Sequence, residues 1–83
     1  MQITWARSAS KELQALPKAK QVAVLEAVSS FAVDPFGSHP NAKPLKGSDG
    51  AVRLRVGEYR VVLVRGKGFI DVVKVAHRKD VYR

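Results

Sequence analysis

Residues 52–64, VRLRVGEYRVVLV, predict a β-hairpin. In the first half, valine and leucine alternate with arginine, which is the two-residue period of a strand with one buried face. Gly57 and Glu58 stand where a two-residue turn belongs, because glycine adopts positive φ without steric cost. Residues 59–64 are rich in β-branched side chains and supply the second strand.

The predicted turn places three arginines on one face of this hairpin. Arg55 faces Arg60 across the two strands, and Arg53 lies two residues further along. Like charges placed directly opposite each other destabilise a sheet, and a bound anion would remove that repulsion. Arginine binds phosphate through a planar, bidentate fork. The pattern therefore indicates either a phosphate-binding site or the solvated basic face of an ordinary sheet.

Size and composition limit the classes of protein that this chain can form. Its 83 residues are expected to form one domain, residues 1–83. A net charge of +8 favours nucleic acid, an anionic membrane or an acidic protein as partner. The absence of cysteine excludes disulfides and thiolate metal sites, and with two histidines we expect neither a metal nor another cofactor. No membrane-span pattern or secretory signal is visible, so we expect a cytoplasmic protein without membrane contact.

The first half of the chain predicts a strand and two helices. Residues 2–5 alternate polar with apolar and indicate a short opening strand. Ser8 or Ser10 is the expected cap of a first helix, and Pro17 separates it from a second helix that ends before Pro35. The apolar stripes expected to face a sheet are Ala9, Leu13 and Leu16 in the first helix, and Val22, Leu25, Val28 and Ala32 in the second, flanked by Val24 and Phe31.

The second half predicts a loop over residues 34–44, the hairpin, and a last strand over residues 69–76. His39 falls in the loop, where a lone histidine is usually solvated. For the last strand we prefer a three-residue turn with Gly68 in the left-handed region. That register buries Phe69, Val73 and Val75, and aligns Lys74, Ala76 and Arg78 with the face of Arg60. A two-residue turn would instead bring His77 onto that face.

These elements give an α+β fold of order β-α-α-β-β-β. Two N-terminal helices pack on one face of a small twisted, mainly antiparallel sheet, and basic residues cover the other face. The opening strand joins the same sheet, either beside the last strand or at the opposite edge.

Three blocks in this order resemble the RelE-type toxins of the RelE/ParE superfamily, which belong to type II toxin–antitoxin pairs. The blocks are residues 45–47, residues 52–61 and residues 75–82 (LKG, VRLRVGEYRV and VAHRKDVY). The resemblance extends over essentially the whole chain and implies the RelE-like fold. It also implies a metal-independent mRNA endoribonuclease that cuts messages in the 30S decoding site of the ribosome and so inhibits translation. A cognate antitoxin would be its protein partner.

In such a reaction the ribose 2′-OH attacks the adjacent phosphate. The enzyme must remove the 2′-OH proton, stabilise charge on the transition state and protonate the leaving 5′-oxygen. The resemblance implies that the site contains Lys46, Arg53, Arg55, Arg60, Arg78 and Tyr82. We expect Lys74, Lys79 and Arg83 to add RNA and phosphate contacts, together with Lys46 and Arg53.

One departure from the family pattern concerns the general base. The best-known ribosome-dependent members tend to carry lysines where this chain has Arg53 and Arg55, and arginine stays protonated in proteins. His77 is the natural candidate, because its ordinary pKa lies near neutrality, unless it faces the helices. Tyr82 would act as base or acid if surrounding cations lower its pKa; otherwise it anchors the C-terminus or stacks on a base.

Two other functions stay open from the sequence. A ParE-like inhibitor of DNA gyrase would use the same scaffold without the basic cluster or Tyr82. A degenerate toxin would only bind its antitoxin or operator DNA. For the endoribonuclease and for the gyrase inhibitor we expect an antitoxin with an acidic segment that gains affinity from the charge of +8.

Overall fold

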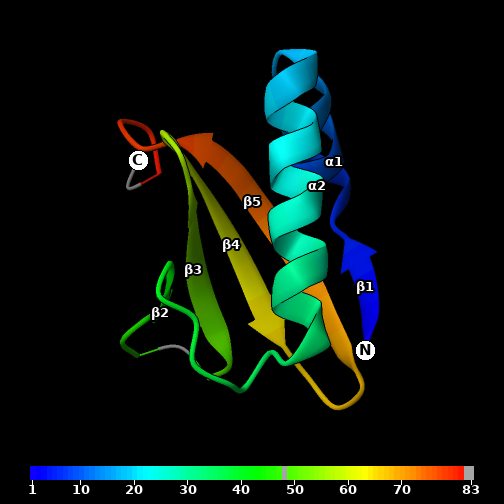
Figure 1. Cartoon of the computed structure of the whole chain (residues 1–83), viewed down its shortest axis with the longest axis vertical. Coiled ribbons are helices and arrows are strands. Elements are labelled where there is room, and N and C mark those ends of the chain that lie inside the picture. The colour runs from blue at the N-terminus through cyan, green and yellow to red at the C-terminus, as the bar shows by residue number, and fades with distance from the viewer. Residues whose placement is uncertain (48, 82–83) are drawn as a thin grey trace.

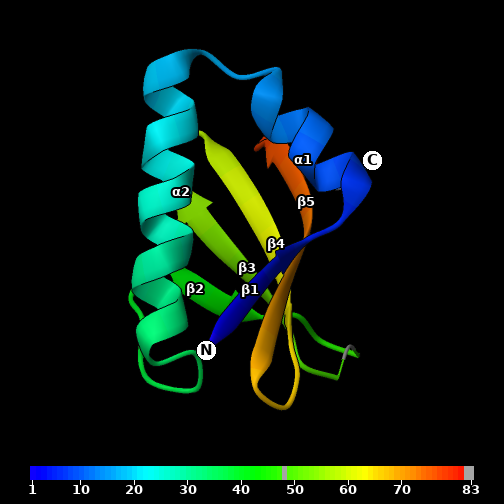
Figure 2. The same cartoon turned by 90° about the vertical axis from the view of Figure 1, so that its right-hand side faces the viewer.

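The computed structural model describes residues 1–47 and 49–81 and shows two helices against a five-stranded sheet. The elements are β1 (Gln2–Trp5), α1 (Arg7–Gln14), α2 (Lys18–Val33), β2 (Ala42–Pro44), β3 (Ala51–Val56), β4 (Tyr59–Arg65) and β5 (Phe69–His77). Both helices lie on one face of the sheet (Figures 1 and 2). The predicted α+β architecture is confirmed.

The strand order β1-β5-β4-β3-β2 settles where the opening strand lies. β1 pairs in parallel with β5, with Ile3 opposite Ile70, and the other neighbours are antiparallel. The expected loop over residues 34–44 is wrong in its last part, because β2 pairs there with β3. Pro44 is compatible with this strand because β2 is the edge of the sheet, where a missing N–H donor does not interrupt the ladder.

The predicted β3–β4 hairpin is confirmed residue by residue. Arg55 lies opposite Arg60, and Val56 lies opposite Tyr59. Gly57 in the turn has φ +60°, the left-handed conformation that a β-carbon disfavours. Local pattern and turn chemistry agree here, so the register is fixed without help from distant residues.

The β4–β5 hairpin differs from the prediction. Arg65 pairs with Ile70 and the Gly66 amide donates to the Phe69 carbonyl at 2.9 Å, so the turn has two residues. The register then shifts between Val62 and Leu63, which makes Val73 the extra residue of a β-bulge. A bulge moves all later side chains to the opposite face.

This bulge corrects the faces expected for β5. Ile70 and Val72 are buried before it and Val75 after it, whereas Phe69 is 39% exposed and Val73 is only half-buried. The alignment of Lys74 and Ala76 with the face of Arg60 is confirmed. Beside the bulge, the Val75 amide donates to Glu12 Oε1 at 2.9 Å, which ties α1 to β5.

The expected caps are also wrong. Ala6 precedes α1 without a side-chain cap, so Ser8 and Ser10 lie inside the helix. The break at Pro17 is confirmed, and a side chain of α2 donates to two carbonyls at and just beyond the end of α1. Gln21 Nε2 donates to the carbonyl oxygens of Leu16 at 2.8 Å and Gln14 at 3.2 Å.

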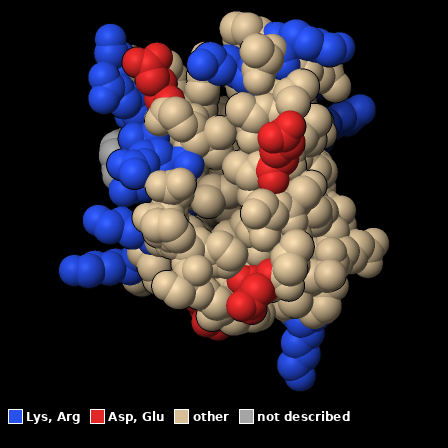
Figure 3. All heavy atoms as spheres, viewed as in Figure 1, with Lys and Arg blue, Asp and Glu red and all other residues tan. Residues whose placement is uncertain are grey.

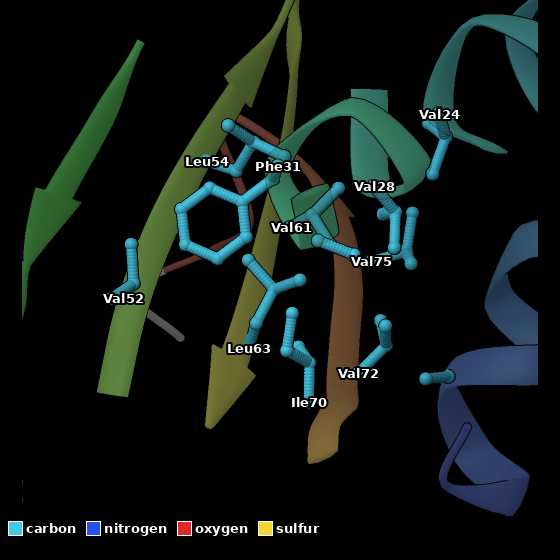
Figure 4. Packing of buried hydrophobic residues seen from close by; sticks show 12 residues of the cluster. Val24, Val28, Phe31, Val52, Leu54, Val61, Leu63, Ile70, Val72 and Val75 are labelled. Carbon is cyan, nitrogen blue, oxygen red and sulfur yellow. The ribbon is translucent and has the colours of Figure 1, made fainter. Parts of the chain in front are cut away.

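The stripe of α2 that faces the core agrees with the prediction at Val28 and Ala32 but not at Val22 and Leu25. Val24, Val28, Phe31 and Ala32 are buried, whereas Val22 and Leu25 are 46% and 45% exposed. Figure 4 shows Phe31 of α2 beside Leu54 of β3, and Val28 beside Val61 and Val75. Since apolar residues surround α2 almost completely, helical spacing alone does not identify its inner face.

Candidate functional site

The face of the sheet away from the helices carries a group of cationic residues. We call Lys43, Arg53, Arg55 and Arg60 the basic cluster. Lys43 of β2 pairs with Arg53 of β3, and Arg55 pairs with Arg60 of β4. Together with Pro40 and Asn41 they line a cavity of about 190 Å³. In Figure 3, Lys and Arg side chains gather at the β2–β3 side of the molecule, which is the left margin.

Arg60 lies among the other arginines, and its guanidinium donates to carbonyl oxygens at the turn between β3 and β4. Its Nη1 donates to the carbonyl oxygens of Gly57 at 2.9 Å and Tyr59 at 3.0 Å. Partial burial lowers the pKa of Arg60 below its usual range, and the charges of Arg55, Arg53 and Arg78 lower it further. The fold therefore holds these positive charges together at a cost that a bound anion would offset.

Arg55 is oriented by the segment that leads into β2. Its backbone amide donates to the Asn41 carbonyl at 2.8 Å, and its Nη2 donates to Asn41 Oδ1 at 3.1 Å. Asn41 thus holds both the backbone and the guanidinium of Arg55. A guanidinium with one donor engaged keeps the others for a phosphate.

The end of β5 brings Arg78 to the turn of the β3–β4 hairpin. The Arg78 amide donates to the Glu58 carbonyl at 2.7 Å, and the charge of Arg78 contributes to the lowered pKa of Arg60. Arg78 therefore lies near the arginines of the basic cluster, although it does not line their cavity.

The other predicted basic residues lie further out. Lys74 is on the same face but is separated from Arg53 by Val62 of β4. Lys46 is exposed in the loop after β2, and Lys79 is exposed beyond β5. None of these three lysines lines the cavity of the basic cluster.

His77 lies on the opposite face of the sheet from Arg60. It pairs with Tyr59, and the two rings meet edge to face with centroids 5.6 Å apart. Its Nδ1 accepts from the Lys79 amide at 3.2 Å, and its Nε2 lies 3.7 Å from Glu58 Oε2. These contacts hold the backbone that carries Arg78. They do not bring the imidazole into the cavity.

Tyr82 and Arg83, predicted as site residues, lie outside the described residues, as does Ser48. Within residues 1–47 and 49–81, no three His, Cys, Asp or Glu residues gather closely enough to hold a metal ion. In the same ranges, no helix is long and apolar enough to cross a membrane.

Asn41 and Lys43 are site residues that the sequence did not predict. Both lie in the stretch predicted to be a loop, and only the pairing of β2 with β3 brings them beside Arg53 and Arg55. The available signal was weak: one lysine before Pro44, in a segment too short for a strand pattern.

We expect pyrophosphate to stabilise this protein more than sodium chloride of equal ionic strength does. An anion that binds only the folded state, at a concentration a hundred times its dissociation constant, adds about 2.7 kcal/mol to the free energy of unfolding. Thermal melts at low salt measure the shift, and Arg60→Gln should remove most of it. An equal shift in that variant would contradict anion binding at the basic cluster.

Comparison with known proteins places this chain in a family. The family described as "ParE toxin of type II toxin-antitoxin system, parDE" matches residues 3–82. The chain belongs to the ParE toxin family. It is thus a toxin of the RelE/ParE superfamily, as the sequence resemblance indicated. No curated protein matches this toxin.

Solved structures agree with this toxin over nearly its whole length. A chain of the RelB–RelE antitoxin–toxin complex from Methanococcus jannaschii is 22% identical, with a TM-score of 0.79, covering 95% of this chain and 94% of that one. A chain of the RelE–RelB complex from Pyrococcus horikoshii is 25% identical, with a TM-score of 0.79 and coverages of 96% and 97%. The isolated Escherichia coli RelE toxin is 18% identical, with a TM-score of 0.80 and coverages of 98% and 89%. The RelE-like fold is confirmed.

Proposed function

We propose that this toxin is a ribosome-dependent mRNA endoribonuclease that inhibits translation. The observation that carries the proposal is the group of arginines around Arg60. Arg55 pairs with Arg60 across β3 and β4, and partial burial, together with the charges of Arg55, Arg53 and Arg78, lowers the pKa of Arg60. Such repulsion is typical of a site built for a polyanion. Guanidinium groups stabilise the negative charge that develops when a 2′-OH attacks a phosphate.

The roles divide between the elements as follows. Arg55 and Arg60 bind the scissile phosphate from adjacent strands, and Arg78 approaches it from the end of β5. Arg53 and Lys43 hold the neighbouring phosphate, since they line the same cavity. Lys46, Lys74 and Lys79 contact the RNA or ribosome further out. Tyr82 is the proposed proton-transfer group and Arg83 a further phosphate contact, both assigned from sequence alone.

The decisive experiment is primer extension on a translated message, with and without ribosomes. We expect stops that need ribosomes and that disappear in Arg78→Ala, whereas Lys67→Ala, a charge removal in the β4–β5 turn, should retain them. Ribosome-independent stops would contradict the proposed target. Retained toxicity in a folded Arg78→Ala protein would contradict the proposed site.

His77 provides a test of where the general base lies. Because its ring is on the face opposite Arg60, His77→Asn should lower cleavage less than about tenfold; a positioned general base contributes about a hundredfold or more. Asparagine keeps an oxygen that can accept from the Lys79 amide. Single-turnover cleavage of ribosome-bound message measures the effect. A loss above about a hundredfold, with unchanged melting temperature, would return the base role to His77.

Inhibition of DNA gyrase is the second candidate, and the match to the ParE family favours it. The two functions differ in which process stops first after induction. Early loss of thymidine incorporation with intact methionine incorporation would support gyrase. A protein that binds ribosomes but never cuts a message would instead be a degenerate toxin.

A cognate antitoxin is the expected protein partner, since solved relatives are toxin–antitoxin complexes. A net charge of +8 favours an acidic segment in that antitoxin. The complex should therefore weaken as salt is raised, to the extent that charge supplies the affinity. The cytoplasm, where ribosomes and messages are found, is the proposed location.

A further inference from the structure

A second hollow adjoins the basic cluster on the other side of the β3 edge. It has a volume of about 200 Å³ and shares Pro40, Asn41 and Arg55 with the first cavity. β2 pairs with β3 as far as Leu54, and the Arg55 amide then donates to the Asn41 carbonyl, so both hollows border these two residues at the edge of β3. The hollow therefore continues from the phosphate-binding face toward α2.

The remaining walls of this hollow are mostly apolar or aromatic. Ala27, Ser30 and Phe31 come from α2, and Leu54 comes from β3. His39 closes the wall, with its ring centroid 4.7 Å from that of Phe31 and its Nε2 donating to the Asp34 carbonyl at 2.6 Å. The imidazole is thus fixed in place and half-buried, although the sequence suggested an ordinary solvated loop histidine.

We infer that this hollow is a subsite for one nucleobase of the RNA whose phosphate binds at Arg55. The inference rests on the proposed function and specifies its substrate contact. A phosphate and a base of the same nucleotide are one ribose apart, and the two cavities are joined through Asn41 and Arg55. Imidazole rings stack on bases that are splayed out of single-stranded RNA. The charge at one end and the apolar wall at the other match the two ends of a nucleotide.

Asn41 is the positioning residue between the two cavities. Its Oδ1 accepts from Arg55, so its amide NH₂ group is the donor that it presents to a ligand. The same side chain thereby orients the phosphate-binding guanidinium and borders the base subsite. No base identity follows, because every base offers a flat face for stacking.

The test uses dinucleotides with a 2′-O-methyl group, which blocks cleavage, and the same dinucleotides lacking either the 5′ or the 3′ base. Nuclear magnetic resonance titration of the whole toxin at low salt gives the dissociation constants. We expect one of the two abasic ligands to bind about tenfold more weakly than the complete dinucleotide, and the other to bind nearly as well.

Adjacent serines on α2 supply a matched pair of variants. Both Ser29 and Ser30 are exposed, but only Ser30 lines the hollow. Ser30→Leu, which fills the space, and His39→Ala, which removes the wall, should abolish the tenfold preference. Ser29→Leu should retain it. Loss of the preference in Ser29→Leu as well would overturn the subsite.

The titrations distinguish failure of the base subsite from failure of the proposed RNA site. If both abasic ligands bind as well as the complete one, and Arg60→Gln weakens all three, the base subsite is overturned while the phosphate site stands. The hollow would then suit an apolar side chain of a protein partner. If no dinucleotide binds, the RNA site of the proposed function is overturned together with the subsite.

Discussion

Arg60→Gln should lower message cleavage by about a hundredfold to a thousandfold, the usual loss when one donor to a developing charge is removed. Arg60 is the member of the cluster that the other arginines surround, and its pKa is lowered by partial burial and by their charges. The variant loses the ionic contact to phosphate. Glutamine keeps an amide that can donate to the Gly57 carbonyl.

The same substitution should leave the protein as stable as before, or more stable. When folding lowers the pKa of a basic group, the charged form of that group destabilises the folded state. This destabilisation is fully present at every pH below the lowered pKa. Neutral pH lies in that range, so replacement by an uncharged residue removes the cost. Lost activity with an unchanged or higher melting temperature is therefore the expected combination.

Single-turnover cleavage of ribosome-bound message and a thermal melt measure the two effects. Arg7→Gln is the matched control, since Arg7 is an exposed arginine on α1, away from the basic cluster. It should change neither quantity appreciably. A fall of less than about tenfold in Arg60→Gln would argue against a transition-state role.

Leu63→Ala should destabilise the fold by about 2 to 5 kcal/mol. Leu63 is fully buried in the middle strand of the sheet, where it belongs to the core cluster with Val61, Ile70 and Val72. Small domains have only about 5 to 15 kcal/mol of stability in total. One cavity in this core therefore removes a large share of it.

Urea denaturation measures the free energy of unfolding of the variant. Val33→Ala is the control, because Val33 is 85% exposed at the end of α2 and should change the free energy by no more than about 0.5 kcal/mol. Equal losses in both variants would show that the core does not lie between α2 and the sheet.

The sequence alone determined the β3–β4 hairpin and its arginine pair. Alternation in residues 52–56 and the glycine at the turn are local signals, and both require Arg55 to face Arg60. The break at Pro17 was predictable for the same reason, because proline restricts its own backbone and that of the residue before it. Of the three family blocks, residues 52–61 lie in this hairpin, residues 45–47 follow β2, and residues 75–82 begin within β5.

Tertiary structure decided the features whose local signals were ambiguous or absent. Apolar residues occur on both faces of β5, so its sequence does not identify the buried face. The bulge at Val73 allows Val75 to pack in the core while Ala76 lies opposite Arg60 on the other face. α2 is apolar nearly all round, so the sheet selects which stripe is buried.

The outer part of the site depends on the same kind of long-range contact. Asn41 and Lys43 reach Arg55 and Arg53 only because β2 adds to the edge of β3, a pairing between segments about ten residues apart that no local pattern specifies. Residue periodicity fixes which side of a strand a side chain occupies, but packing between distant segments fixes which side becomes the core.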